Sequence, residues 1–392
     1  MLERSYFFER RGNQPPITVE IIKDAVQLAV ERQLVSDVPL GVLLSGGIDS
    51  SVVASCARKF GPVQTFSIRF DDARYDESEH ARQIAAYIGS QHHVFHVTPK
   101  VIEDLPKLAQ VFGVPFADSS ALPTHYLARE TRKHVKVALS GDGADELFGG
   151  YDRYLAMQMP NLKALAVLRP VGEALAKGHP KAFFTRLGRF MKTLGAADAR
   201  RYASFLRLFD AKTVKLLIGR DLLLDTAEFL YSQHRSRSQD AVTAALSFDR
   251  GLYLPRDLLT KVDRCSMLHG LEVRSPFMDH ELVQFAAGLT TDQLLKGGPK
   301  RMLREAFKDD LPAWVFKRKK MGFAVPIGEW FRGELRAMLR DTLFASNAFG
   351  RSHFNMKVVE RLVDEHESGR VDHSQRLYAL LMLELWWQTT SS

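Results

Sequence analysis

The chain has 392 residues, of which 45% are hydrophobic and 26% charged, and its formal net charge at pH 7 is +8. This length suffices for one large core or two lobes, and no apolar run reaches the roughly 18 residues that suggest a membrane span. The two cysteines exclude a disulfide framework, no Cys/His cluster has zinc spacing, and the N-terminus lacks the apolar segment of a signal peptide, so we expect a cytoplasmic protein.

In chain order, residues 1–16 are polar and end in two prolines, which is typical of an arm or linker. Residues 19–34 carry apolar side chains on one helical face and predict an amphipathic helix. Apolar runs of strand length then alternate with segments of helical spacing, which indicates an α/β fold with a doubly wound, mostly parallel sheet. The predicted strands are 38–44, 63–70, 91–97 and 135–139, and the helices are 50–60, one ending at 88, 101–112 and 118–132.

Strand signals fade beyond this predicted core, and the rest of the chain has mainly helical spacing up to an apolar helix over 376–388. Basic residues are densest between 186 and 220, where their alternation with Phe and Leu favours a solvated helix face over a nucleic-acid surface. We therefore expect an arm of 1–16, an α/β core of 17–160, a helical region of 161–250 and a large helical C-terminal part of 251–392 that completes a substrate cleft.

A glycine turn joins the first predicted strand to the next helix, with the sequence Ser45-Gly46-Gly47-Ile48-Asp49-Ser50. Glycine lets the backbone approach a ligand closely, and the free N–H groups at a helix start favour a phosphate. Asp49 would repel a bare phosphate, so its expected role is to hold a Mg²⁺ ion. A glycine turn with a capping aspartate is the simpler alternative, which the full string disfavours.

A second glycine-rich loop follows the strand predicted over 135–139 and carries Asp142, Asp145 and Glu146 among small residues. Ligands of doubly wound sheets bind at the carboxyl ends of the strands, so we expect both loops in one cleft. Asp145 could share a Mg²⁺ ion with Asp49, because crowded carboxylates repel each other without a cation. Acidic side chains that complement a helix dipole are the alternative here.

The string Ser45–Ser50 resembles the pyrophosphate loop of ATP pyrophosphatases, which cleave ATP between the α and β phosphates and adenylate a substrate. Five further stretches narrow the resemblance to the asparagine synthetase family, in the family's order and over residues 20–388. They are Ser140–Tyr151, Leu258–Arg264, Glu272–Asp279, Lys300–Glu305 and Lys317–Phe323. This resemblance implies a sheet of the ATP pyrophosphatase type, also called adenine nucleotide α-hydrolase-like.

The resemblance also implies roles for single residues, with Asp49 and Asp145 as the Mg²⁺ ligands. Asp142 takes the place of a glutamate that acts on the adenylate and the incoming ammonia, and its side chain is shorter by one methylene. Lys320 would stabilise charge that develops on the acyl-adenylate or pyrophosphate. The implied ATP-binding residues are Leu43, Leu44, Ser45, Gly46, Gly47, Asp49, Ser50, Ile68, Ser140 and Gly141. The residues implied to shape the cleft are Lys261, Asp263, Arg274 and Asp279. Structural ion pairs are the alternative role for these four residues.

Complete glutamine-dependent members of that family begin with a glutaminase domain whose first residue after Met is a catalytic Cys, and this chain has Leu2 there. We therefore expect the chain alone not to hydrolyse glutamine. Free ammonia, ammonia from a separate glutaminase and another amine all remain open as the nitrogen source. The sequence could also be a piece of a longer protein.

Together, the residues and the resemblance predict an ATP-dependent, AMP-forming carbon–nitrogen ligase that joins a carboxylate, by default aspartate, to ammonia or an amine. Lasso-peptide cyclases and β-lactam synthetases resemble the same fold and keep a peptide or another small carboxylate open as substrate. A tRNA-modifying ATP pyrophosphatase is a further alternative, but it would need a concentrated basic face, which the sequence does not indicate. An inactive relative that only binds a partner is another alternative, and the presence of Asp49 and Asp145 argues against it. We expect no nucleic acid and no membrane as partners, and a homodimer stays open.

Overall fold

The computed structural model describes residues 17–72, 74–98, 100–159, 167–175, 183–221, 226–234, 240–318, 323 and 325–390. The chain forms two units, which are described separately. Unit 1 comprises Met1–Pro99, Pro123–Leu155 and Leu246–Ala324, and unit 2 comprises Lys100–Leu122, Ala156–Ala245 and Val325–Ser392. Across the described ranges, every helix is too short or too polar to cross a membrane.

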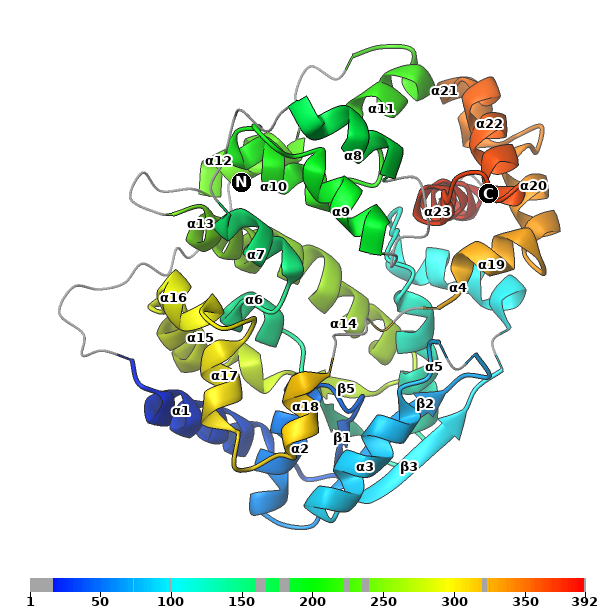
Figure 1. Cartoon of the computed structure of the whole chain (residues 1–392). Coiled ribbons are helices and arrows are strands. Elements are labelled where there is room, and N and C mark those ends of the chain that lie inside the picture. The colour runs from blue at the N-terminus through cyan, green and yellow to red at the C-terminus, as the bar shows by residue number, and fades with distance from the viewer. Residues whose placement is uncertain are drawn as a thin grey trace. The chain divides into compact units, whose positions relative to one another are not determined.

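A five-stranded parallel sheet in the order β3-β2-β1-β4-β5 forms the centre of the described part of unit 1 (Figure 1). This confirms the predicted doubly wound, mostly parallel sheet, and four of its strands lie within the predicted ranges. The fifth strand was not predicted. The strands are β1 Leu40–Leu43, β2 Gln64–Arg69, β3 Gln91–His96, β4 Val137–Leu139 and β5 Glu272–Arg274.

The order of the strands defines where a ligand crevice lies. The chain adds β2 and β3 on one side of β1, and then returns to place β4 and β5 on the other side. The direction of winding therefore reverses between β1 and β4, and in open α/β sheets the crevice for ligands lies at the carboxyl ends of such strands. The loops that leave β1 and β4 are the two glycine-rich loops of the sequence.

Helices of unit 1 cover this sheet, with α2 against β1, α3 against β2 and β3, and α14 against β5. Helix α1 buries Ile22, Val26, Ala29 and Val30, as the predicted amphipathic pattern requires. A π-helical segment, η2, leads directly into α14. These helices are α1 Val19–Gln33, α2 Ile48–Lys59, α3 Ser78–Ile88, α6 Ala144–Phe148, η2 Asp249–Leu259, α14 Thr260–Met267, η3 Pro276–Met278, α15 His280–Ala287, α16 Thr291–Leu295, α17 Arg301–Ala306 and α18 Ala313–Lys317.

The described part of unit 2 is helical. Its last helix, α23, buries Leu377, Leu380, Leu381 and Leu385, which confirms the predicted apolar helix. The indole N–H of Trp386 donates to the carbonyl of Gly113 at 3.0 Å. The helices are α4 Val101–Phe112, α8 Arg169–Leu175, α9 Phe183–Met191, α10 Asp198–Leu206, α11 Ala211–Ile218, α12 Thr226–His234, α19 Ile327–Arg332, α20 Arg336–Leu343, α21 Phe349–His353, α22 Met356–Glu367 and α23 Ser374–Thr390, while α5 Ala121–Thr131, α7 Asp152–Gln158 and α13 Ala241–Phe248 cross unit boundaries.

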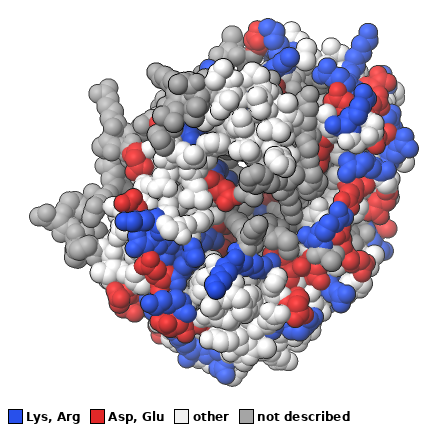
Figure 2. All heavy atoms as spheres, in the orientation of Figure 1, with Lys and Arg blue, Asp and Glu red and all other residues white. Residues whose placement is uncertain are grey.

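Charged side chains of both signs are interspersed on the face shown in Figure 2. Basic side chains of unit 1 form ion pairs with acidic ones, such as Lys59 with Asp310 at 2.7 Å and Arg32 with Glu281 at 2.8 Å. Mixed charges of this kind are typical of an ordinary solvated surface.

Candidate functional site

The first glycine-rich loop leaves β1 and opens α2. The backbone N–H of Leu44 still donates to Phe66 in β2 at 2.8 Å, and the turn begins after it. Gly46 has a φ of 73°, a left-handed conformation that glycine adopts without strain. The hydroxyl of Ser50 accepts from the backbone N–H of Ser45 at 3.2 Å, which ties the start of the helix back to the strand end.

Helix α2 has no side-chain cap at its N-terminus, because Gly47 stands at the N-cap position. Ser51 is the first residue of this turn and helix whose backbone N–H donates to a carbonyl of the turn, that of Gly47 at 3.0 Å. The N–H groups of Ile48 and Ser50 in the first turn donate to no carbonyl of the described residues, and with the helix dipole they favour an anion.

The second glycine-rich loop packs directly on the first. A β-carbon at Gly141 would lie 2.8 Å from both the β-carbon of Asp49 and the backbone nitrogen of Ser50. Only glycine permits this approach without displacing the backbone of the first loop. The N–H of Ser140 donates to Arg274 of β5 at 2.9 Å, which fixes the start of the loop to the edge of the sheet. The structure thus brings the two loops together at the winding reversal.

Asp49 and Asp145, the two carboxylates predicted to hold Mg²⁺, face a common cation in this structure. Nζ of Lys300 lies 2.6 Å from both carboxylate oxygens of Asp49 and 2.7 Å from Oδ1 of Asp145. The side chain of Lys300 is only 7% exposed, compared with 23% for Asp49 and 16% for Asp145. A single compact charge therefore bridges the two carboxylates at the mouth of the first loop.

The electrostatics of this cluster keep the lysine charged. Burial opposes the ammonium form, but Asp145 and Asp49 outweigh burial and raise the pKa of Lys300 above its usual value. The backbone of Lys300 is also unusual, because it has φ 56° and ψ 35° and is the non-glycine residue with positive φ in the described part of the chain. A left-handed conformation costs a residue with a β-carbon about 1–2 kcal/mol, and such outliers cluster at functional sites.

A buried polar network lies directly after Asp145 in the chain. Glu146 is fully buried, accepts a hydrogen bond from the hydroxyl of Tyr151, and has a pKa raised to about 7 by burial and by the neighbouring Asp145. Nearby in the same unit, the guanidinium of Arg153 lies 3.8 Å from the ring centroid of Tyr151 and pairs with the buried Asp249 at 2.7 Å. This network anchors the segment that carries Asp145.

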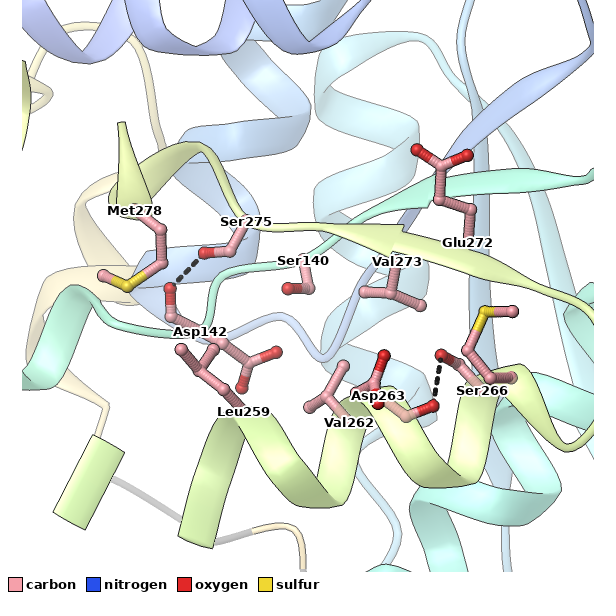
Figure 3. Close-up of a pocket in the computed structure, with 11 residues that line it drawn as sticks. Ser140, Asp142, Leu259, Val262, Asp263, Ser266, Glu272, Val273, Ser275 and Met278 are labelled. Atoms are coloured by element: carbon pink, nitrogen blue, oxygen red, sulfur yellow. Dashed lines mark hydrogen bonds between the residues drawn. The ribbon is translucent and has the colours of Figure 1, made fainter. Parts of the chain in front are cut away.

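Asp142 lines a pocket of about 250 Å³ beside the second loop (Figure 3). Burial raises the pKa of its carboxyl, and the nearby Lys261 opposes that shift. Its backbone carbonyl accepts a hydrogen bond from the hydroxyl of Ser275, which follows β5. The described residues around the pocket are Ser140, Asp142, Leu259, Val262, Asp263, Ser266, Met267, Glu272, Val273, Ser275 and Met278.

The apolar residues expected near the nucleotide lie at the carboxyl ends of β1 and β2. Leu43 is half-buried, whereas Leu44 and Ile68 are 2% and 5% exposed, so Leu43 offers the most accessible side chain of the three. The hydroxyl of Ser45 lies 3.1 Å from that of Ser50 and accepts from the backbone N–H of Gly47 at 3.3 Å. Both serines therefore shape the loop from within.

Other predicted residues have structural contacts or cannot be placed. Arg274 donates to the carbonyls of Gln33 and Val35 at 2.9 and 2.7 Å, and Asp279 caps α15. Both residues also form ion pairs, Arg274 with Glu272 at 2.6 Å and Asp279 with Arg32 at 3.1 Å. Lys320 lies outside the described residues. Arg318, two positions earlier, donates to the carbonyl of Ser45 at 3.4 Å and pairs with Glu77 at 2.5 Å.

Lys300 is the site residue to which the sequence analysis assigned no role, although it opens one of the motifs quoted there. Its only local signal is its place after Gly297-Gly298-Pro299, a turn-rich string that leads into α17. The pairing with Asp49 joins residues 251 positions apart, which periodicity and local spacing do not detect.

Comparison with known proteins gives a match that covers the segments described above. The family described as "Asparagine synthase" matches residues 22–388. The chain belongs to the asparagine synthase family. The match includes both glycine-rich loops, the pocket and Lys300, and it confirms the predicted family and its type of α/β fold.

Individual relatives cover most of this chain but only part of their own length. The chain is 31% identical over 377 residues to "Asparagine synthetase [glutamine-hydrolyzing] 1" of Bacillus subtilis, covering 94% of this chain and 59% of the relative. It is 33% identical over 371 residues to "Putative asparagine synthetase [glutamine-hydrolyzing]" of Mycobacterium tuberculosis H37Rv, covering 91% of this chain and 56% of the relative. The chain therefore spans somewhat more than half the length of these curated relatives.

The carboxylate pair fits a Mg²⁺ ion that also binds phosphate. Mg²⁺ is usually held by one or two carboxylates together with water and substrate phosphates, rather than by a full set of protein ligands. Asp49 and Asp145 already share one small cation, the ammonium of Lys300. Over the described ranges no group of three or more His, Cys, Asp or Glu side chains could hold a metal ion, so the remaining ligands would have to come from ATP and water.

Proposed function

We propose that this protein is an ATP-dependent, AMP-forming carbon–nitrogen ligase that adenylates a carboxylate and transfers the acyl group to ammonia or an amine. Aspartate with ammonia, and hence asparagine biosynthesis, is the default pair. The observation that carries the proposal is the contact between two glycine-rich loops at the winding reversal of the sheet, with Asp49 and Asp145 converging on one cation. That arrangement suits a nucleotide whose pyrophosphate is neutralised there.

In this proposal the first loop binds the phosphates of ATP through the N–H groups of Ile48 and Ser50 at the start of α2. Leu43, Ser45 and Ile68 contact the nucleotide at the carboxyl ends of β1 and β2, and Ser140 and Gly141 close over it. Leu44, Gly46, Gly47 and Ser50 hold the shape of this loop. Helix N-termini and close backbone approach are the usual means of phosphate recognition.

Asp49 and Asp145 would hold Mg²⁺, which would supply positive charge to offset the charge on the departing pyrophosphate. The substrate carboxylate attacks the α-phosphorus, a new O–P bond forms, and the bond to the β-phosphate oxygen breaks. Lys300, whose ammonium pairs with both carboxylates, would add positive charge on the same side of the loop. The residues thus mainly position reactants and stabilise charge.

The second half-reaction forms the carbon–nitrogen bond. The amine attacks the acyl carbon of the acyl-adenylate, and AMP leaves with the electrons of the broken C–O bond. Asp142 is the proposed proton acceptor, because it lies on the second loop beside the pocket and its raised pKa favours proton uptake. Lys320 is the proposed stabiliser of the developing charge.

The test is pyrophosphate release from Mg·ATP across a panel of amino acids and carboxylic acids with ammonium or amines, followed by mass spectrometry of the products. We expect AMP, pyrophosphate and one amide in equal amounts. A peptide product would support a lasso-peptide cyclase-like ligase, and a ring closed within one small substrate would support a β-lactam synthetase-like ligase. ATP turnover that requires tRNA would overturn the assignment as an amide ligase.

The Asp49→Asn variant tests the metal assignment. It should lose pyrophosphate release and keep the wild-type circular dichroism spectrum, because an amide cannot replace a charged metal ligand. Asp24→Asn, at an exposed position of α1, is the matched control and should behave as wild type. Near-normal turnover of Asp49→Asn at saturating Mg²⁺ would contradict the assignment.

The remaining parts of the proposal concern binding partners and cellular location. We propose small-molecule substrates, a cytoplasmic location and no nucleic-acid or membrane partner. A separate glutaminase as ammonia source, a peptide substrate and a homodimer are alternatives that the same product analysis and a measurement of solution mass would test.

A further inference from the structure

Arg318, the residue directly after α18, connects that helix to the first glycine-rich loop. Its Nη1 donates to the backbone carbonyl of Ser45 at 3.4 Å, and its Nη2 pairs with Glu77 at 2.5 Å. The side chains of Arg318 and Glu77 are each only 13% exposed. The planar fork of arginine can hold two acceptors in a fixed relation. One arm therefore forms a largely buried ion pair, and the other reaches the backbone of the candidate phosphate site.

Helix α3, which begins directly after Glu77, contacts both the loop and α18. A β-carbon at Gly46 would lie 2.6 Å from the carbonyl carbon of His80 and 2.7 Å from the backbone nitrogen of Ala81, both in the first turn of α3. The ring centroids of His80 and Trp314, a residue of α18, are 5.7 Å apart. The start of α3 thus supports the loop and holds Arg318 beside it.

The carbonyl that Arg318 holds determines where the next N–H group points. In a planar trans peptide the C=O of Ser45 and the N–H of Gly46 point in opposite directions. The N–H of Gly46 therefore points away from Arg318, and it donates to no carbonyl of the described residues. An N–H group without a partner, next to the start of a helix, is suited to bind an anion.

Gly46 alone does not fix this orientation. Glycine adopts positive and negative φ about equally well, so the Ser45–Gly46 peptide can turn over at little cost. The turned peptide would present a carbonyl oxygen where the N–H group now points, and that oxygen would repel a phosphate. Arg318 opposes the turn, because a charged donor makes a stronger hydrogen bond to the carbonyl than a neutral donor does.

We propose that Arg318 is a positioning residue that orients the Ser45–Gly46 peptide so that the N–H of Gly46 faces the phosphates of the nucleotide. Glu77 holds the guanidinium in place. This inference rests on the proposed nucleotide site, and it adds the N–H of Gly46 to those of Ile48 and Ser50. Arg318 touches no phosphate in this role, since it acts through the backbone of the loop.

Calorimetric titration with Mg·pyrophosphate tests the inference without turnover. Arg318→Met removes both arms and should weaken Mg·pyrophosphate about 10-fold. This is near the lower limit of about 10-fold for a hydrogen bond to a charged group, because the arginine contact is long at 3.4 Å. Arg82→Met is the matched control, since it removes an exposed pair with Glu79 in the same helix α3 and should leave the affinity unchanged.

Arg318→Lys separates the ion pair from the contact with the loop. Lysine keeps a positive charge for Glu77, but its side chain is one bond shorter and ends in one nitrogen. This variant should unfold at the wild-type Tm and still bind Mg·pyrophosphate nearly as weakly as Arg318→Met. An ion pair with a structural role only predicts that lysine restores the affinity in full. Wild-type affinity in Arg318→Lys, or no binding of millimolar Mg·pyrophosphate to the wild-type protein, would overturn the inference.

Turnover distinguishes this inference from the ligase function. With Mg·ATP and the accepted carboxylate, both Arg318 variants should raise KM for ATP more than they lower kcat, because the N–H of Gly46 contacts phosphate in the ground state and in the transition state. Mg·pyrophosphate binding that depends on Arg318, in a wild-type protein that forms no AMP, would refute the ligase and retain the positioning role. AMP-forming turnover with unchanged Mg·pyrophosphate affinity in both variants would refute the positioning role and retain the ligase.

Discussion

Replacement of Lys300 by methionine removes the cation that joins Asp49 and Asp145. The variant keeps the length and apolar stem of the side chain, and it leaves two carboxylates close together, with Oδ1 of Asp145 inaccessible to solvent. Breaking a buried pair by removing one partner costs about 3–5 kcal/mol. Because Asp49 and Asp145 are 23% and 16% exposed, water screens part of this cost, and about 3 kcal/mol is the expected loss.

The backbone of Lys300 makes a second variant informative. Lys300→Gly also removes the ammonium, but glycine adopts a φ of 56° without the roughly 1 kcal/mol strain that Lys and Met carry there. Lys300→Gly should therefore be more stable than Lys300→Met by about 1 kcal/mol, less any packing lost with the side-chain stem. For cooperative unfolding of a 392-residue chain, about 3 kcal/mol corresponds to a fall in Tm of about 4 °C.

The decisive assay is thermal unfolding with and without millimolar Mg²⁺. In the wild-type protein Mg²⁺ must displace the ammonium from Asp49 and Asp145, whereas in Lys300→Met the two carboxylates are free to bind it. Because a ligand of the native state stabilises by mass action, Mg²⁺ should raise the Tm of Lys300→Met more than that of wild type. Lys296→Met, at an exposed position, is the control. A wild-type Tm and an unchanged Mg²⁺ response in Lys300→Met would refute the shared-cation argument.

Three further predictions follow from other residues. Gly150→Ala should destabilise the fold by more than about 1 kcal/mol and lower pyrophosphate release. The reason is that the added β-carbon would lie 1.8 Å from Oδ1 of Asp145 and 2.2 Å from Cε of Lys300. An unchanged Tm would show that Asp145 and Lys300 can shift to make room, and would contradict this prediction. His366 is fully buried, and burial lowers its pKa below the usual 6.5, so its contribution to stability is present at higher pH and is lost as pH falls below about 6.5; the Tm of His366→Gln should fall less than that of wild type from pH 7.5 to about pH 5. Lys320→Ala should lower kcat about 10²–10³-fold with little change in ATP affinity, and Lys319→Ala should have a much smaller effect; equal losses would remove Lys320 from the reacting centre.

The sequence predicts those parts of the fold that have strong local patterns. Strands β1, β2 and β3 are apolar or alternating runs of four to six residues, and each was found within its predicted range. Strand β5 is only three residues long, with Val273 between two charged residues, so it has no detectable period. It forms because β4 offers its free edge and Glu272 and Ser140 make backbone hydrogen bonds across the pair.

The candidate site likewise contains residues that the sequence predicts and residues that it does not. Asp49 and Asp145 stand out because carboxylates among glycines at strand ends are locally unusual. Lys300 does not stand out, since one lysine among 54 basic residues carries no signal until distant segments meet. The structural contacts of Arg274 with Gln33 and Val35 likewise join residues about 240 positions apart. Long-range electrostatic partners are therefore what the three-dimensional structure adds.

The charge of the cluster beside the first loop bears on how ATP binds. Asp49 and Asp145 supply two negative charges and Lys300 one positive charge, so the cluster is net negative and would repel a bare phosphate. A Mg²⁺ ion held by the two carboxylates would reverse the sign of this cluster and favour the polyanionic nucleotide. We therefore expect ATP to bind more tightly with Mg²⁺ than without it, and we expect its affinity to fall at high ionic strength because salt screens the attraction.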